Sequence, residues 1–222
     1  MREFKLSNKK DPIDVLDYKE PICKIYFVRH GQTNANKNHL LFGHLDYDLN
    51  KQGIKDANLA AKKLAQIVNK SAHSHIDYIV SSPLKRAKHT AKVIAKRLSI
   101  KKFVIDKNLI EKSEGLWEGK SFWEVREKDK KNYLNWIKNP FFNKPPKGES
   151  VNDLNARVKK FHQIVLKKYL GKNVIVVSHS GPIRLFILNL LGADIKKFWY
   201  LKTNCGSITE VNVSKKHSLI LI

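Results

Sequence analysis

The sequence of 222 residues contains few cysteines, few acidic residues and no long hydrophobic run. Cys23 and Cys205 are its only cysteines and no Cys-x-x-Cys motif occurs, so we expect neither a disulfide framework nor a cysteine zinc site. This scarcity favours a reducing compartment, and we predict a cytoplasmic protein. The most apolar stretch near the C-terminus, residues 183–191, is too short to cross a membrane, and residues 1–5 lack the apolar segment of a signal peptide. We therefore expect no association with a membrane.

Acidic residues are outnumbered, since 43 lysines and arginines face 20 aspartates and glutamates and the formal net charge is +23. Such a charge fits either a polyanionic partner or a surface of solvated lysines. The basic residues are spread along the chain, without an aromatic-interleaved basic block or a nucleic-acid-binding motif. We therefore expect solvated lysines and no specific nucleic-acid partner, although the charge can speed the encounter with small phosphorylated molecules.

Strand-like and helix-like patterns alternate along the chain after a polar, aperiodic extension over residues 1–20. The expected strands cover about 24–28, 78–81, 103–105, 173–177, 207–213 and 219–222. The expected helices cover about 50–68, 82–98, 121–138, 150–170 and 182–191, the first four starting at the capping residues Asn50, Ser82, Ser121 and Ser150. This alternation predicts a single α/β domain over 21–222, a three-layer α/β/α sandwich around a mostly parallel sheet. An exposed edge strand near the C-terminus would allow a homodimer.

Two of the expected strands end in a histidine that is followed by a turn containing glycine. The first strand runs into Arg29 and His30, and a later strand runs into His179. Parallel strands place such ends on one edge of a sheet, where α/β proteins bind ligands. Arg86, near the start of the second expected helix, would reach the same edge. Taken singly, each histidine fits a structural role and Arg86 fits a solvated helix face, but together they predict an anion site, and phosphoryl is the anion that fits best.

Five blocks of the sequence, in order and with matching spacing, resemble the histidine phosphatase superfamily, which includes phosphoglycerate mutases and small-molecule phosphatases. The blocks are VRHGQT at 28–33, SSPLKRA at 81–87, LIE at 109–111 with GLWEG at 115–119, GES at 148–150 with Arg157, and VSHSGPIR at 177–184. The match covers about residues 24–213. Gln32 and Ser180 stand where the family often has an acidic residue and a glycine, and neither is a core catalytic position. The resemblance implies a phosphoglycerate mutase-like fold.

For the chemistry, the resemblance implies that His30 attacks phosphorus and becomes a phosphohistidine, while a backbone carbonyl holds its other ring nitrogen. Glu111 is the implied general acid, which protonates the leaving oxygen and then activates water. The donors expected to bind the phosphoryl oxygens are Arg29, Asn36, Arg86, His179 and Ser180. No metal and no cofactor are expected, because a phosphate ligand is the better interpretation of His179.

Two other glutamates in the same loop, Glu114 and Glu118, compete for the role of general acid. Glu111 is preferred because it precedes Gly115 by four residues, as in the family motif, and Glu118 is interpreted as a structural anchor of the loop. The aromatic-rich segment within 112–149 is expected to form a lid-like insertion that sets specificity. Ordinary packing of a helix onto the domain is an equally good and compatible interpretation.

The predicted function is therefore hydrolysis of small phosphomonoesters through a phosphohistidine. One alternative is a cofactor-dependent phosphoglycerate mutase, but residues 111–150 lack the tyrosine-glycine and glycine-leucine-asparagine-lysine signatures of that group. The other alternative is a non-enzymatic protein on the same fold that binds anions or nucleic acid. The presence of Glu111 beside the other site residues argues against it, because a binding module needs no general acid near a phosphate.

Overall fold

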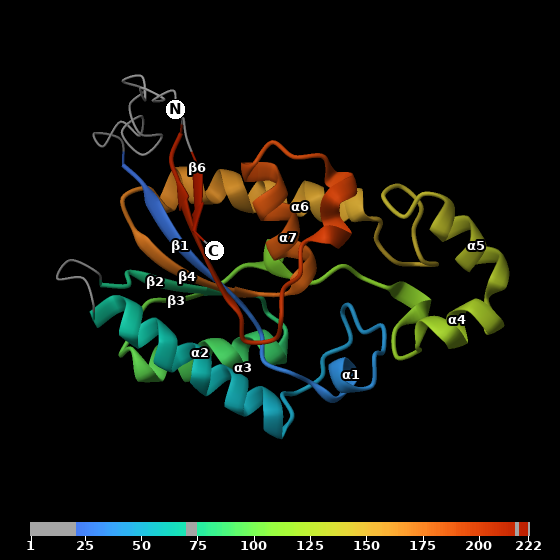
Figure 1. Ribbon diagram of the computed structural model, residues 1–222, viewed down its shortest axis with the longest axis horizontal. Helices are drawn as coiled ribbons and strands as arrows, with labels where there is room; N and C mark the ends of the chain where they lie inside the picture. The colour runs from blue at the N-terminus through green and yellow to red at the C-terminus, as the bar shows by residue number, and fades with distance from the viewer. Residues whose placement is uncertain (1–20, 70–74, 216–217, 222) are drawn as a thin grey trace, which may run out of the picture.

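The computed structural model describes residues 21–69, 75–215 and 218–221, so the extension predicted at 1–20 lies outside the described residues. At the centre is a six-stranded sheet in the order β3-β2-β4-β1-β5-β6 (Figure 1). Its strands are Cys23–Arg29 (β1), Tyr78–Ser81 (β2), Phe103–Ile105 (β3), Asn173–Ser178 (β4), Ile208–Val213 (β5) and Ser218–Leu221 (β6). β3, β2, β4 and β1 are parallel, whereas β5 is antiparallel to both β1 and β6. The prediction of a mostly parallel sheet is confirmed.

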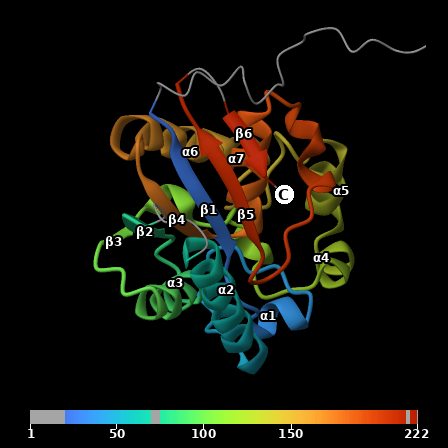
Figure 2. The ribbon, with the colours of Figure 1, turned by 60° about the vertical axis from the view of Figure 1, so that its left-hand side comes forward.

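Helices cover both faces of the sheet, as Figures 1 and 2 show from two directions. One face carries Lys51–Asn69 (α2) and Lys85–Arg97 (α3), and the other carries Val151–Ile164 (α6) and Ser180–Leu190 (α7). Side chains of β1 and β4 alternate between two cores, with Tyr26, Val28, Ile175 and Val177 in one and Ile25, Phe27, Val174 and Val176 in the other. Because each buried aliphatic or aromatic side chain stabilises the fold by about 1.5–3 kcal/mol, these two cores hold the layers together. The predicted three-layer sandwich is confirmed.

One helix start differs from the prediction. The helix after β2 begins at Lys85 rather than at Ser82, and its N-cap, Leu84, makes no side-chain hydrogen bond. The Ser82 hydroxyl accepts from the backbone N–H of Leu84 at 3.4 Å, ahead of the first turn, and lies 2.8 Å from Nε2 of His179. By contrast, Ser150 caps α6 as predicted, and its hydroxyl accepts from the third backbone N–H of that helix.

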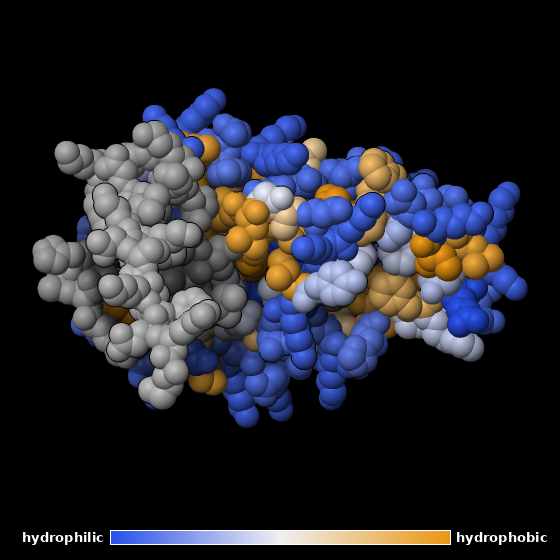
Figure 3. Space-filling model, turned by 45° about the horizontal axis from the view of Figure 1, so that its top comes forward, coloured by the Kyte–Doolittle hydropathy of each residue, from blue (hydrophilic) through white to orange (hydrophobic). Residues whose placement is uncertain are grey.

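The helix expected at 121–138 is two helices, Phe122–Lys128 (α4) and Lys130–Lys138 (α5). The break falls at Asp129, whose backbone lies outside the helical region at φ −136° and ψ 46°. Its carboxylate accepts a hydrogen bond of 2.8 Å from Nε1 of Trp117, which ties the break to a buried indole. The two helices project from one end of the sandwich (Figure 1), and hydrophobic side chains gather on the surface at that end (Figure 3).

The remaining helical segments are short. They are Asn34–Lys37 (α1), Lys107–Leu109 (η2), Gly115–Trp117 (η3), the π-helical Val165–Tyr169 (η4) that continues α6, and Ile195–Tyr200 (η5). Within the ranges that the structure describes, no helix has the length and apolar character needed to cross a membrane.

Candidate active site

The carboxyl edge of the parallel strands brings the predicted histidines together. Arg29 pairs with Ser178 in the parallel register of β1 and β4, so His30 and His179 leave the sheet at the same level. Their ring centroids are 5.0 Å apart. β2 lies on the other side of β4, and the turn after β2 leads into α3, which carries Arg86. The expected assembly of three strand ends at one edge is what the structure shows.

His30 is buried, with 1% of its surface exposed, and its ring has a defined orientation. Nδ1 lies 2.7 Å from the carbonyl oxygen of Gly31, which can only accept, so Nδ1 carries the proton and Nε2 keeps its lone pair. Burial, then the charges of Arg86 and Arg29, hold the pKa of His30 well below its ordinary 6.5. The ring is therefore neutral at physiological pH, the form that can attack phosphorus.

Arg86 is fully buried, so the interpretation of it as part of a solvated helix face is wrong. Its guanidinium donates to the carbonyl oxygens of Gly43 (2.7 Å) and Leu45 (2.9 Å) and to Nδ1 of His179 (3.3 Å). The ring of Phe42 stacks on it at 4.7 Å from the centroid. Burial lowers the pKa of Arg86 to about 10, which leaves it charged at neutral pH. Three of its five N–H groups are used, and two remain for an anion.

His179 is fully buried and has a partner at each ring nitrogen. Nδ1 accepts from Nε of Arg86, so the neutral ring carries its proton on Nε2, which donates to the Ser82 hydroxyl at 2.8 Å. Burial and then the charge of Arg86 hold the pKa of His179 well below its ordinary value. Ser82 is therefore a site residue that the sequence indicated only as a helix cap. Its position directly after a strand at the site edge is the signal that could have identified it.

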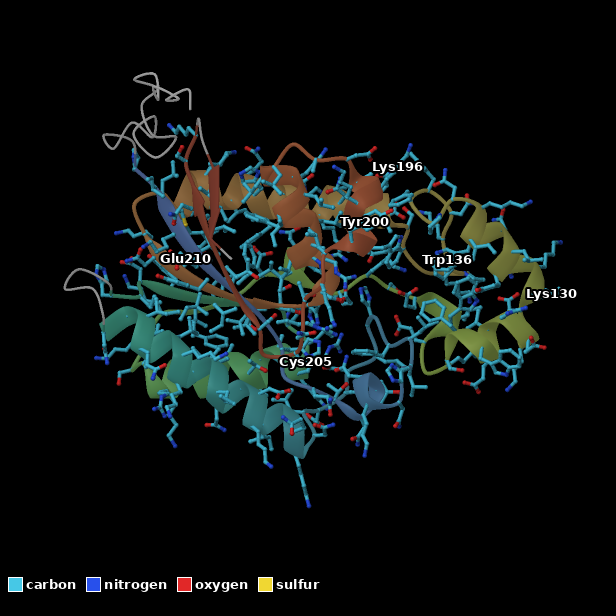
Figure 4. All side chains as sticks on the ribbon, in the orientation of Figure 1. Lys130, Trp136, Lys196, Tyr200, Cys205 and Glu210 are labelled. Carbon is cyan, nitrogen blue, oxygen red and sulfur yellow. The ribbon has the colours of Figure 1, made fainter. Side chains whose placement is uncertain are left out.

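Arg29 lines two neighbouring cavities beside the histidines. The larger, of about 660 Å³, is also lined by Asn36 and by Cys205, which Figure 4 shows on the loop before β5. Nη1 of Arg29 donates to the carbonyl oxygen of Thr203 (2.6 Å), and its buried Nε has no partner among the described residues. Oδ1 of Asn36 accepts from the N–H and hydroxyl of Thr33, and the amide N–H groups of Asn36 have no acceptor within the described ranges, so they can face a ligand.

Glu111 lines the smaller cavity, of about 190 Å³, together with Ser180 and Gly181 at the start of α7. Its carboxylate accepts from the N–H of Lys112 (2.9 Å), the Ser180 hydroxyl (3.2 Å) and the N–H of Gly181 (3.3 Å). A carboxylate that faces a cavity and is held by neutral donors alone is free to exchange a proton with a ligand. The structure thus places Ser180 against the predicted acid.

The two competing glutamates have other partners. Glu118 accepts from the backbone N–H groups of His44 (2.8 Å), Leu45 (2.7 Å) and Glu114 (3.0 Å), so it anchors the loop. Glu114 pairs with Nζ of Lys112 at 2.7 Å, although burial raises its pKa. This arrangement favours Glu111, the only one of the three that is both in the cavity and without a cationic partner in contact.

Arg157 fixes the loop that carries Glu111. Its Nε and Nη2 bind the carboxylate of Glu149 with two bonds of 2.9 and 2.8 Å. The same guanidinium donates to the carbonyl oxygens of Asn108, Ile110 and Glu111 at 2.9–3.2 Å. One arginine thereby satisfies three backbone carbonyls of an irregular segment. The fourth sequence block, which contains Glu149 and Arg157, therefore holds the loop of Glu111 in place.

The aromatic residues of 112–149 divide between cavity wall and packing. Phe122 lines both cavities and Trp136 lines the smaller one. Figure 4 shows Trp136 where α4 and α5 face the rest of the molecule. Trp117 is buried and packs edge-on against Trp136, with centroids 5.7 Å apart, whereas Trp123 is 65% exposed. Among the described residues, no group of three histidine, cysteine or acidic side chains is placed to hold a metal ion.

A family model described as "Histidine phosphatase superfamily (branch 1)" matches residues 25–221, and the chain belongs to that family. It is 34% identical over 200 residues to phosphoserine phosphatase 1 of Hydrogenobacter thermophilus, covering 90% of this chain and 91% of the relative. It is 26% identical over 199 residues to the adenosylcobalamin/alpha-ribazole phosphatase of Escherichia coli, covering 90% and 94%. A solved structure of a putative alpha-ribazole-5′-P phosphatase from Escherichia coli has a TM-score of 0.80 at 25% identity, covering 90% and 95%.

The phosphoglycerate mutase-like fold expected from the sequence is confirmed by these relatives. Within the superfamily, the chain is a histidine-phosphatase-type phosphatase, a phosphoric monoester hydrolase. The alternatives of a phosphoglycerate mutase and of a non-enzymatic binding protein are not favoured.

Proposed function

We propose that hydrolysis proceeds in two steps through a phosphohistidine on His30. Nε2 of His30 forms a bond to phosphorus as the bond from phosphorus to the leaving oxygen breaks, and Glu111 gives its proton to that oxygen. The Glu111 carboxylate then takes a proton from water, whose oxygen attacks phosphorus and breaks the P–N bond. Phosphate leaves, and both residues return to their starting states. The observation that carries this proposal is the contact of 2.7 Å that fixes the protonated Nδ1 of buried His30.

The transferring phosphoryl group is negatively charged, and its oxygens need preorganised donors. Arg29 and Arg86 bring two positive charges to the His30 edge, and the N–H groups that they still have free can face phosphoryl oxygens. Asn36 adds a neutral donor from the larger cavity. His179 and the Ser82 hydroxyl, which are hydrogen-bonded to each other, contribute to phosphate binding as a pair. No metal ion has a role in this scheme.

Trapping of the phosphoenzyme tests the nucleophile. Brief mixing with a phosphomonoester labelled on phosphorus should leave a label on the protein that acid removes and alkali does not. His30→Ala should carry no label and show no turnover, whereas His75→Ala, on an exposed side chain, should behave as the unchanged protein. An acid-stable adduct, or labelling of His30→Ala, would show that a residue other than His30 is the nucleophile.

We further propose that the segment 112–149 acts as a lid over the two cavities, since Phe122 and Trp136 form part of their walls. Substrate exclusion by this lid would set specificity. Phosphoserine and alpha-ribazole phosphate, the compounds in the names of the relatives, head a hydrolysis panel that also includes sugar phosphates and nucleotides. The panel compares the unchanged chain with a variant that lacks the rings of both Phe122 and Trp136. Selective hydrolysis by the unchanged chain and equal rates for all substrates in the variant would support the lid.

The remaining proposals concern partners and location. We propose that the chain acts in a reducing, cytoplasmic environment and without a specific nucleic-acid partner, because Cys23 and Cys205 are both free and the basic residues are dispersed. β6 forms one edge of the sheet, and a homodimer through this edge stays a prediction. Light scattering on the purified protein measures the oligomeric state directly.

A further inference from the structure

We propose that Arg184 binds a carboxylate of the leaving group, so that the preferred substrates are small phosphomonoesters of hydroxy acids. This proposal rests on the proposed function, because it assumes that Glu111 protonates the leaving oxygen. It assigns a specificity-determining residue that lies outside the set predicted to bind phosphate, which is Arg29, Asn36, Arg86, His179 and Ser180.

The smaller cavity is the place for the leaving group. A general acid must be within hydrogen-bonding reach of the oxygen that it protonates, and Glu111 lines this cavity. Arg29 lines it as well and also lines the larger cavity, so the space joins the phosphate-binding edge. Its volume of about 190 Å³ is below the range of roughly 300–1,000 Å³ for pockets that hold drug-sized ligands. A leaving group of a few carbon atoms fits this space better than a nucleoside does.

Arg184 lies in the wall of this cavity, on the same helix face as Gly181, which donates to the Glu111 carboxylate. Its guanidinium carbon lies 5.5 Å from the centroid of the Phe198 ring. Stacking on an aromatic face leaves the N–H groups at the edge of the guanidinium plane available for a planar, bidentate acceptor such as a carboxylate.

Arg184 has no hydrogen-bonding or ionic partner among the described residues, and its Nε is buried without an acceptor. Two other cations line the cavity. Lys112 pairs with Glu114, and Arg29, which donates to a backbone carbonyl, is assigned to the phosphoryl group. Burial lowers the pKa of Arg184, as expected for a cation that lacks a neutralising contact. Arg184 as a whole is half-buried, but a buried donor such as its Nε is unfavourable while it lacks an acceptor, and an anionic ligand would supply one.

A second role for Arg184 is to tune Glu111, whose charge acts on it although the two form no ion pair. The two roles predict different results. Tuning of the acid would affect every substrate and would shift the pH profile of all of them. Carboxylate binding affects only substrates that have a carboxylate, and it acts mainly on KM.

The experiment compares Arg184→Gln with the unchanged protein on phosphoserine and phosphoethanolamine, which differ only by the carboxylate. The unchanged protein should prefer phosphoserine. In Arg184→Gln the ratio of the two kcat/KM values should fall by roughly 10- to 100-fold, the range for a lost hydrogen bond to a charged group. Arg184→Lys should recover part of the ratio. Arg97→Gln, in which an exposed arginine in the last turn of α3 is lost, should leave the ratio unchanged.

Three outcomes would overturn the proposal: no preference for phosphoserine in the unchanged protein, a preference for a nucleoside phosphate, or an equal loss on both substrates in Arg184→Gln. Hydrolysis of p-nitrophenyl phosphate, which lacks a carboxylate, separates this failure from failure of the proposed function. If p-nitrophenyl phosphate is hydrolysed at the same rate by both proteins, the variant is folded and the catalytic scheme stands. If neither protein hydrolyses any phosphomonoester, the proposed function itself is wrong.

Discussion

The imidazole rings of His30 and His179 lie with centroids 5.0 Å apart and planes inclined by 59°. They meet because β1 and β4 are neighbouring parallel strands, in which Arg29 and Ser178 are paired. Both rings are buried beside Arg86, and burial together with its charge keeps both rings neutral. A pair of neutral histidines beside arginines leaves the positive charge on the guanidinium groups and the nucleophilic lone pair on His30.

The stability of the fold should decrease as the pH falls below about 6.5. His30 and His179 have depressed pKa values in the folded state, so the unfolded chain binds more protons in this window. Each such histidine contributes a slope of about 1.4 kcal/mol per pH unit in the free energy of unfolding. His30→Asn should therefore show a shallower slope between pH 6.5 and 5, as measured by urea unfolding at several pH values. The same slope in both proteins would mean that His30 is protonated in the folded state.

Removal of Arg157 should lower both stability and turnover. Arg157→Gln removes the cationic partner of Glu149 and the guanidinium donor of three loop carbonyls, and we expect a loss of about 2–3 kcal/mol in the free energy of unfolding. kcat should fall more than KM rises, because the displaced loop carries Glu111. Lys144→Ala, which removes an exposed ion pair with Asp153, is the matched control and should cost less than about 1 kcal/mol. Equal effects of the two substitutions would show that Arg157 does not position the loop.

A methyl group at position 181 should displace the general acid. The Cβ of Gly181→Ala would overlap Oε1 of Glu111 and lie 2.9 Å from Cδ2 of Leu154, so the carboxylate must move. Because general acid catalysis typically contributes about 10²–10⁴-fold, we expect a displaced acid to lower kcat by roughly 10- to 100-fold. In a Glu111→Ala background the same substitution should have little further effect on kcat. A full additional loss there would mean that Gly181 acts through another group.

Chelation of metal ions should leave activity unchanged. Arg29, Arg86 and the pair formed by His179 and the Ser82 hydroxyl supply the groups that the proposed scheme needs around the phosphoryl oxygens, and no step requires a metal ion. Dialysis against EDTA followed by assay at fixed ionic strength measures this. Loss of activity that Mg²⁺ or Zn²⁺ restores would contradict the scheme.

Sequence patterns sufficed for the parts of the molecule that depend on local periodicity and on strand order. The alternation of patterns predicted the three layers, and histidines after two strands predicted the site edge. The break at Asp129 could not be predicted in this way, because it depends on a hydrogen bond to Trp117. The start of α3 was misplaced for the same kind of reason, since Ser82 binds His179 from another strand.

By itself, the sequence determined which residues stand at the strand ends, His30 and His179 above all, and which family pattern they complete. Only the tertiary structure decided that Ser82 binds His179, that Glu111 faces a cavity and that Arg184 has no hydrogen-bonding or ionic partner within the described part of the chain. The physical reason is that hydrophobic periodicity and strand order act along the chain, whereas a charge or a hydrogen bond depends on which distant groups approach within a few ångströms. The order of helices and strands can therefore be predicted from the sequence, whereas the partners of each polar side chain cannot.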